Sequence, residues 1–181
     1  MGRARRFASC VFLPYWSRAN VPAGAAVCDV SSYADFPYCT LSPIWVHGGI
    51  PVPGMPGTTS DTVEGIWQGL KVIRGAIAPR SFGGRGHKRG GKPAGHQFGN
   101  RLLGIVEARQ QIFRVAYEWV LEHRVDRTLV EGWVEKALSE VTQYFHDVGD
   151  NGNMNDPDAP WAHAAALVQY LNRQCAERTG K

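Results

Sequence analysis

Glu64, Gln68 and Lys71 are the residues whose types and spacing point most directly to chemistry. At positions i, i+4 and i+7 of a helix they form one polar row of an acid, an amide and an amine. The carboxylate of Glu64 is suited to act as a general base or to stabilise an oxocarbenium-like transition state. Burial would raise its pKa, whereas Lys71 or Arg109 would lower it. The structural alternative is a salt bridge from Glu64 to Lys71 or to a neighbouring segment of the chain.

A helix over about residues 61–73 must position this row. Its apolar residues Val63, Ile66, Trp67 and Leu70 fall on one face, and the polar row lies beside that face. Thr59 or Ser60 is the expected N-cap. A polar row at the edge of a buried face can line a cleft.

A basic, glycine-rich segment follows the helix. From Gly65 to Val106 the chain has no Asp or Glu, whereas its basic residues there are Lys71, Arg74, Arg80, Arg85, Lys88, Arg89, Lys92 and Arg101. This imbalance indicates phosphate groups on a nucleotide or a nucleic acid. Residues 75–99, which include His96, are either a disordered basic loop or an ordered loop that wraps a ligand.

A second helix is expected over about Asn100 to His123, and Arg109 falls in the middle of its apolar stripe. An unpaired buried guanidinium is costly. Arg109 therefore pairs with Glu64 or with a C-terminal Asp, contacts a ligand, or extends past its neighbours into solvent.

The remaining elements frame this region. We expect strands at Ala25–Val30, Leu41–Val46 and Val141–Phe145, a rigid proline-rich loop over 48–58, and helices at Leu129–Leu138 and Trp161–Glu177.

Three further residues are candidates with structural alternatives. Asp147 lies in a cluster of acids and amides that is either a solvated turn or the source of a second carboxylate for the Glu64 site. His163 and His47 are either satisfied core residues or members of a site.

The composition is that of a soluble globular protein of 181 residues with a net charge of +4. No apolar run is long enough to cross a bilayer. The four cysteines show no metal-like spacing, so we expect free thiols, no metal, no cofactor and a cytoplasmic location.

Two segments together resemble the NADAR superfamily (NAD- and ADP-ribose-associated), which includes N-glycosidases. Glu64, Gln68 and Lys71 match its first motif in order and spacing, and Phe98–Arg109, with Asn100 and Arg109, is similar to its later motif. Leu41–Ile44 stands where the family has a Phe-Ser-Asn-Phe/Tyr segment. The chain also resembles a bacterial and phage family of unknown function through the segments Cys28–Ser31, His47–Pro53 and Trp161–Ala164.

The resemblance implies a single compact α+β domain with helices packed around a small sheet. A NADAR-like core would cover about residues 25–123, and 124–181 would form a C-terminal extension. The family's catalytic Asp, which is followed closely by Trp-Gly, is missing, and Gly95-His96 stands where the Trp-Gly would be expected. Either Asp147 or Asp150 replaces it, or His96 or His163 takes its role, or the protein binds without cleaving.

The implied activity is hydrolysis of a base–ribose N-glycosidic bond in an ADP-ribosylated or phosphoribosylated compound, with Glu64 as the catalytic residue and Asp147 and His163 as further candidates. The ligand would be a nucleotide, an ADP-ribose-type molecule or a modified nucleic acid. The expected binding residues are Trp45, His47, Trp67, Gln68, Lys71, His96, Asn100 and Arg109. The alternatives are a non-catalytic nucleotide or nucleic-acid binding module that uses residues 71–101, and an interaction module with a vestigial site.

Overall fold

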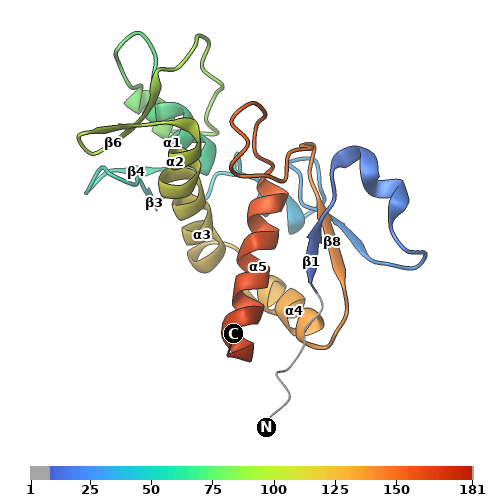
Figure 1. The fold of residues 1–181 in the computed structure, drawn as a ribbon. Coiled ribbons are helices and arrows are strands. Elements are labelled where there is room, and N and C mark those ends of the chain that lie inside the picture. The colour runs from blue at the N-terminus through green and yellow to red at the C-terminus, as the bar shows by residue number, and fades with distance from the viewer. Residues whose placement is uncertain (1–8, 181) are drawn as a thin grey trace. The chain divides into compact units, whose positions relative to one another are not determined.

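The computed structural model describes residues 9–180 and confirms the expected α+β class (Figure 1). By its contacts the chain divides into two compact units. Unit 1 combines the described part of Met1–Leu41 with Val125–Asn153 and the described part of Ala159–Lys181. Unit 2 consists of Ser42–Arg124 and Met154–Asp158. The residues expected to form a C-terminal extension therefore mostly complete the unit that contains the first strands.

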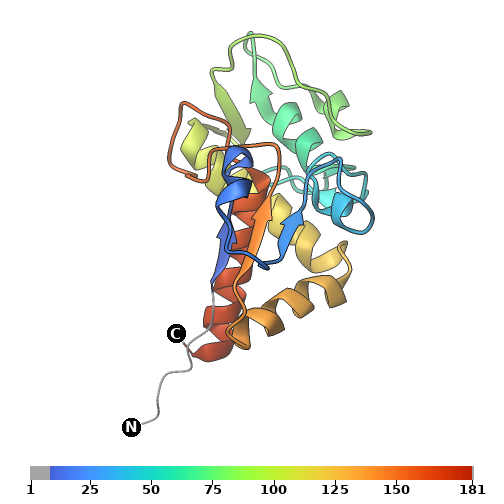
Figure 2. The ribbon, with the colours of Figure 1, turned by 90° about the vertical axis from the view of Figure 1, so that its right-hand side faces the viewer.

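Unit 1 is built on a three-stranded parallel sheet in the order β1-β8-β2. The strands are β1 (Cys10–Phe12), β2 (Val27–Asp29) and β8 (Gln143–His146). The helices α4 (Arg127–Leu138) and α5 (His163–Thr179) pack against the central strand β8 (Figure 2). Phe145 in this strand is fully buried and meets Trp133 of α4 edge-on, with ring centroids 5.0 Å apart. Short 3₁₀ helices, η1 (Tyr15–Asn20) and η2 (Tyr38–Leu41), complete unit 1.

Unit 2 consists of short antiparallel strands and three helical stretches. The strands are β3 (Ile50–Pro51), β4 (Thr59–Ser60), β5 (Lys71–Val72), β6 (Gly95–Phe98) and β7 (Arg101–Leu103). The helical elements are α1 (Val63–Leu70), the 3₁₀ helix η3 (Pro79–Phe82), α2 (Ile105–Ala108), a π-helical turn η4 (Arg109–Phe113) and α3 (Arg114–His123). β3 pairs with β4, and β5, β6 and β7 form a second sheet.

Helix α1 is shorter than the predicted span, and its cap is a different residue. The side chain of Thr62 accepts a hydrogen bond of 2.8 Å from the backbone N–H of Gly65, so Thr62 is the N-cap and the expected caps Thr59 and Ser60 are wrong. The helix ends at Leu70 because Lys71 pairs with His96 in the β5–β6 ladder. Val63, Ile66 and Leu70 are at most 1% exposed, which confirms the predicted apolar face.

The predicted helix from Asn100 to His123 starts too early. Residues 101–103 form β7, which returns along β6 after a turn at Gly99-Asn100, and the helix begins at Ile105. The predicted strand over Leu41–Val46 is also wrong. Leu41 ends a 3₁₀ helix, and the backbone N–H of Trp45 bonds to the carbonyl of Ser42 in a turn.

The other predicted elements are present with shifted ends. They are β2 within 25–30, α4 around 129–138, β8 around 141–145 and α5 around 161–177. Among the described residues, no helix has the length and apolar character needed to cross a membrane.

The assignment of the cap of α1 predicts a stability difference. Thr62→Ala removes an acceptor for a buried N–H and should lower the free energy of unfolding by about 1 kcal/mol, measured by urea unfolding with circular dichroism. Thr59→Ala is the matched control because Thr59 is exposed. A larger loss in Thr59→Ala than in Thr62→Ala would contradict the assignment.

Candidate functional site

The predicted polar row exists as a chain of hydrogen bonds. The Nε2 of Gln68 donates to the Oε1 of Glu64 at 2.6 Å. The Oε1 of Gln68 accepts from the Nζ of Lys71 at 2.9 Å and from the backbone N–H of Arg89 at 3.1 Å. Because the amide oxygen already receives two donors, the NH₂ group must face the carboxylate. Gln68 is 3% exposed, so its orientation is fixed by these partners.

Burial dominates the electrostatics of this row. It raises the pKa of Glu64 above its ordinary value, against the hydrogen bond from Gln68 and the charges of Lys71 and Lys88. Burial also lowers the pKa of Lys71, against the charge of Glu64. A carboxylate whose pKa is raised toward neutrality is a better proton acceptor than an exposed one.

Arg89 ties the basic segment to the end of α1. Its Nη1 donates to the carbonyl of Gln68 at 3.0 Å and to that of Lys71 at 2.6 Å, and its Nη2 donates to the carbonyl of Ala76 at 3.4 Å. The last carbonyls of a helix lack partners within the helix and carry partial negative charge, so a guanidinium stabilises them. We predicted no specific role for Arg89 from the sequence, although the carbonyls at the end of a helix are a place to expect a cation.

The segment before Arg89 packs on the first turn of the same helix. Gly86 has a φ of +73°, and a Cβ built there would lie 2.6 Å from the backbone nitrogen of Gly65. Only glycine permits this backbone conformation at so close an approach. Residues 75–99 therefore follow an ordered path, with η3, β6 and these contacts along it, whereas the expectation that they wrap a ligand stays a prediction.

His96 lies beside this row with its imidazole buried. Its ring stacks on Trp67 with centroids 3.9 Å apart and an interplanar angle of 32°, and Phe113 meets Trp67 edge-on at 5.9 Å. His96 is 1% exposed, and neither ring nitrogen has a hydrogen-bond partner among the described residues. Burial and the charge of Lys71 lower its pKa to about 4, so the ring is neutral near pH 7. An unsatisfied buried imidazole is costly and is a reason to expect a ligand or a water there.

Arg109 is buried and binds the C-terminal segment that contains Asp156. It is 4% exposed, and its Nη1 donates to the backbone carbonyls of Met154, at 3.0 Å, and of Asp156. The alternative that it extends into solvent is therefore wrong. Burial lowers its pKa, and the charge of Asp156 opposes this effect. Within unit 2, Arg109 connects the segment 154–158 to the π-helical turn.

The other predicted binding residues of unit 2 are less enclosed. Trp45 is 39% exposed. The backbone N–H of His47 donates to the carbonyl of Asp61 at 2.9 Å. Asn100 is exposed in the turn between β6 and β7.

Asp147 and His163 belong to unit 1 and bind each other. The Nδ1 of His163 lies 2.8 Å from the Oδ2 of Asp147, and its Nε2 lies 2.8 Å from the carbonyl of Val30. The carboxylate of Asp147 also accepts the N–H groups of Gly149 and, at 2.9 Å, of Ala164 in the first turn of α5. Asp147 thus caps a helix whose own N-cap residue is Ala162.

These contacts give both residues a structural role within unit 1. Asp147 is 2% exposed, so the solvated-turn alternative is wrong for it. Burial raises its pKa, but the hydrogen bonds and charge of His163 and the N–H groups of Ala164 and Gly149 outweigh burial, so the pKa is lowered overall. The contacts of His163 match the alternative in which it is a core residue whose ring nitrogens both have hydrogen-bond partners.

The four cysteines Cys10, Cys28, Cys39 and Cys175 are free, as predicted. Burial raises the pKa of Cys10 and of Cys28 to about 12, so both remain thiols near pH 7. Among residues 9–180, no group of three or more His, Cys, Asp or Glu side chains is placed to hold a metal ion.

Comparison with known proteins assigns the chain to a family. The model of the Family of unknown function (DUF6939) matches residues 17–168, and the chain belongs to this family. No curated protein matches the chain, and no solved structure does.

The contacts of Asp147 predict how stability depends on pH. Because its pKa is lowered on folding, the stabilisation is complete above its unfolded value of about 3.9 and is lost as the pH falls through the folded value. Asp147→Asn should cost about 1–3 kcal/mol at pH 7 and should flatten the acid limb of the stability curve, measured by urea unfolding between about pH 3 and 7.

Glu135→Gln, at an exposed position of α4, is the control for Asp147→Asn. It should leave both the stability and its pH dependence close to those of the wild type. An unchanged acid limb in Asp147→Asn would show that this carboxylate does not carry the pH dependence.

Proposed function

We propose that the protein is an N-glycosidase-like hydrolase that cleaves a base–ribose N-glycosidic bond in an ADP-ribosylated or phosphoribosylated compound. The observation that carries this proposal is the Glu64 carboxylate, which burial makes more basic and which Gln68 holds beside Lys71. The resemblance of this row and of Phe98–Arg109 to the NADAR motifs supports the same assignment.

The chemistry assigned to Glu64 follows from the charges that develop in the reaction. As the C1′–N bond breaks, its electron pair leaves with the base and positive charge develops on the ribose. A preorganised carboxylate stabilises that charge and accepts the proton of the water whose oxygen bonds to C1′. The hydrogen bond from Gln68 keeps the carboxylate in place. Because the carboxylate is already oriented before the reaction, the site does not have to reorganise as charge develops.

The surroundings of Glu64 suit a nucleotide. Lys71, with the exposed cations Arg85, Lys88 and Lys92, would hold phosphate groups. The stacked rings of Trp67 and His96 lie next to the row, and the neutral imidazole has one donor and one acceptor to offer to a base or a ribose. His96 stands near the place of the Asp that is missing from the NADAR pattern.

The test is release of free base, read by mass spectrometry. Wild type and Glu64→Gln are incubated with NAD, with ADP-ribosylated nucleoside or DNA, and with phosphoribosyl pyrimidines. Glu64→Gln can still accept the hydrogen bond from Gln68, so it should fold normally but lose about 10²–10³-fold in rate.

Glu107→Gln is the matched control because Glu107 is an exposed carboxylate of unit 2 that pairs with Arg101 at 3.4 Å. It should release base at the wild-type rate. Equal release by wild type and Glu64→Gln, or no release from any of these compounds, would contradict the proposal.

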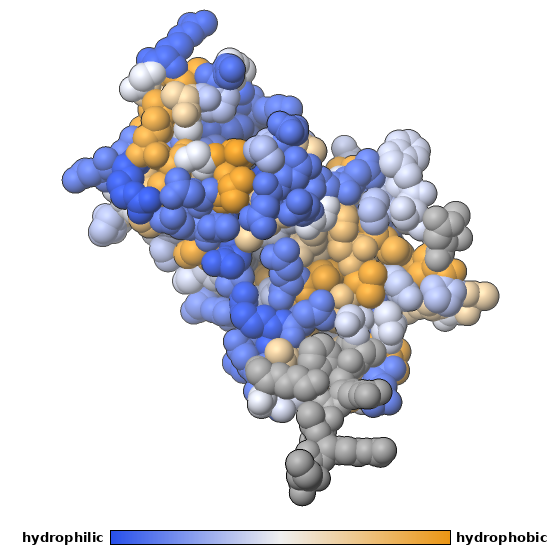
Figure 3. Space-filling model, in the orientation of Figure 1, coloured by the Kyte–Doolittle hydropathy of each residue, from blue (hydrophilic) through white to orange (hydrophobic). Residues whose placement is uncertain are grey.

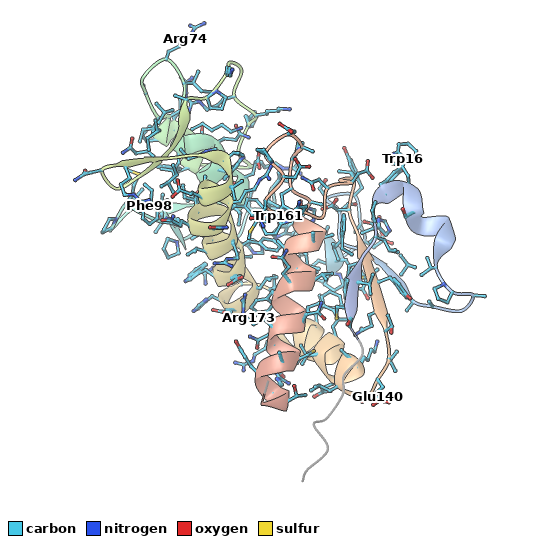
Figure 4. All side chains as sticks on the ribbon, viewed as in Figure 1. Trp16, Arg74, Phe98, Glu140, Trp161 and Arg173 are labelled. Atoms are coloured by element: carbon cyan, nitrogen blue, oxygen red, sulfur yellow. The ribbon has the colours of Figure 1, made fainter. Side chains whose placement is uncertain are left out.

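The second candidate is a non-catalytic nucleotide or nucleic-acid binding module. The observation that favours it is the group of exposed basic residues Arg74, Arg80, Arg85, Lys88, Lys92 and Arg101 in a segment without acids. Hydrophilic residues project from unit 2 around Arg74 (Figures 3 and 4).

Salt dependence separates binding to a nucleic acid from binding to a small nucleotide. If about six phosphates are contacted, the affinity for single- or double-stranded DNA should fall by about 10³-fold between roughly 50 and 200 mM salt, measured by fluorescence anisotropy. A flat salt dependence, or no binding at low salt, would argue against the nucleic-acid module.

A further inference from the structure

Unit 1 has a hollow of about 380 Å³ at the carboxyl ends of its parallel strands. All three strands point the same way, so the segments that follow them meet at one edge of the sheet. The lining residues come from each of them: Tyr15 and Trp16 after β1, Asp29, Ser31 and Tyr33 at and after the end of β2, and Val148 and Asp150 after β8. In parallel sheets this edge is where ligands bind, because loops from several strands converge there.

Two aromatic side chains that line this hollow are exposed to solvent. Trp16, labelled in Figure 4, is 80% exposed. Tyr33 is 85% exposed. Tyr15 packs edge-on against Trp16 with centroids 5.1 Å apart, which supports the indole from one side. Large exposed apolar side chains that gather around a hollow mark a binding surface more often than isolated ones do.

The charges of the hollow are of one sign. Asp29 and Asp150 line it, and none of the described lining residues is Lys or Arg. The Oδ1 of Asp29 accepts the backbone N–H of Ser31 at 2.8 Å, which fixes this carboxylate at the end of β2. Aromatic faces together with carboxylates attract organic cations through the ring quadrupole and the opposite charge.

We propose that this hollow is a binding site for a small organic cation that carries a substituted ammonium or a guanidinium group. The cation would lie against Trp16 and Tyr33, with Asp29 and Asp150 balancing its charge. The volume is in the range of small-molecule sites. A neighbouring hollow of about 430 Å³ shares Asp29 and Tyr33, but it runs along β2 toward the start of β8 and is lined by Lys136, so the cation belongs in the first hollow. The proposal concerns unit 1 alone and is independent of the activity proposed for Glu64.

The test is calorimetric titration of the full chain with choline and with agmatine. The uncharged carbon isostere of choline, which has the same shape without the charge, is the matched ligand control. Either cation should bind, and the isostere should bind at least about threefold more weakly, because only the cation gains from the rings and carboxylates. Trp16→Leu, Tyr33→Leu and Asp150→Asn should each weaken binding by about 3–30-fold.

Two control variants show whether these losses are specific. Phe36→Leu removes an aromatic ring that is 78% exposed but lines neither hollow, and Glu135→Gln removes an exposed charge from α4. Both should bind the cation as wild type does, and circular dichroism confirms that each variant is folded. The proposal is overturned if neither cation binds at about 10 mM, if the isostere binds equally well, or if the double variant Trp16→Leu/Tyr33→Leu binds with unchanged affinity.

Discussion

The hydrogen bond from the amide of Gln68 to the carboxylate of Glu64 is the interaction on which the candidate site depends. A carboxylate withdrawn from water needs a donor, and a buried amide needs partners at both ends. Gln68 meets both requirements because its oxygen is held by Lys71 and by the backbone of Arg89. The side chain of Gln68 thus links Glu64 of α1 to Lys71, the first residue of β5, and to Arg89 in the basic segment.

The same requirement explains why the basic segment lies against α1. The guanidinium of Arg89 serves the carbonyls at the end of the helix, and Gly86 makes room for backbone contact at its start. A segment with several exposed cations would otherwise repel itself and extend into solvent. Its cations are thereby kept near a carboxylate whose pKa burial raises, an arrangement suited to an anionic ligand.

The sequence predicted the Glu64 row because its geometry is local: residues four and three apart on a helix are neighbours in any fold. It did not predict the strand pairings and hydrogen bonds between residues that are far apart in the sequence. In the β1–β8 ladder, Cys10 pairs with Gln143, which is far away in the sequence. Local sequence patterns do not report such distant pairing, so they could not place the C-terminal region in the sheet of unit 1. The carbonyls that Arg109 binds have no side-chain signature at all. The N-cap was misplaced because Thr59, Ser60 and Thr62 are all suitable cap residues, and only the chain path selects Thr62.

The candidate site rests on the carboxylate of Glu64, whose pKa is raised by burial while Gln68 holds it in place. The direct measurement is a ¹³C NMR titration of the Glu64 carboxyl carbon, assigned by its disappearance in Glu64→Gln. We expect a pKa above the ordinary value of about 4.3 in wild type, and a still higher one in Gln68→Leu, which loses the donor that favours the charged form. A pKa at or below the ordinary value would rule out this effect of burial, and a pKa that Gln68→Leu leaves unchanged would rule out the role of Gln68.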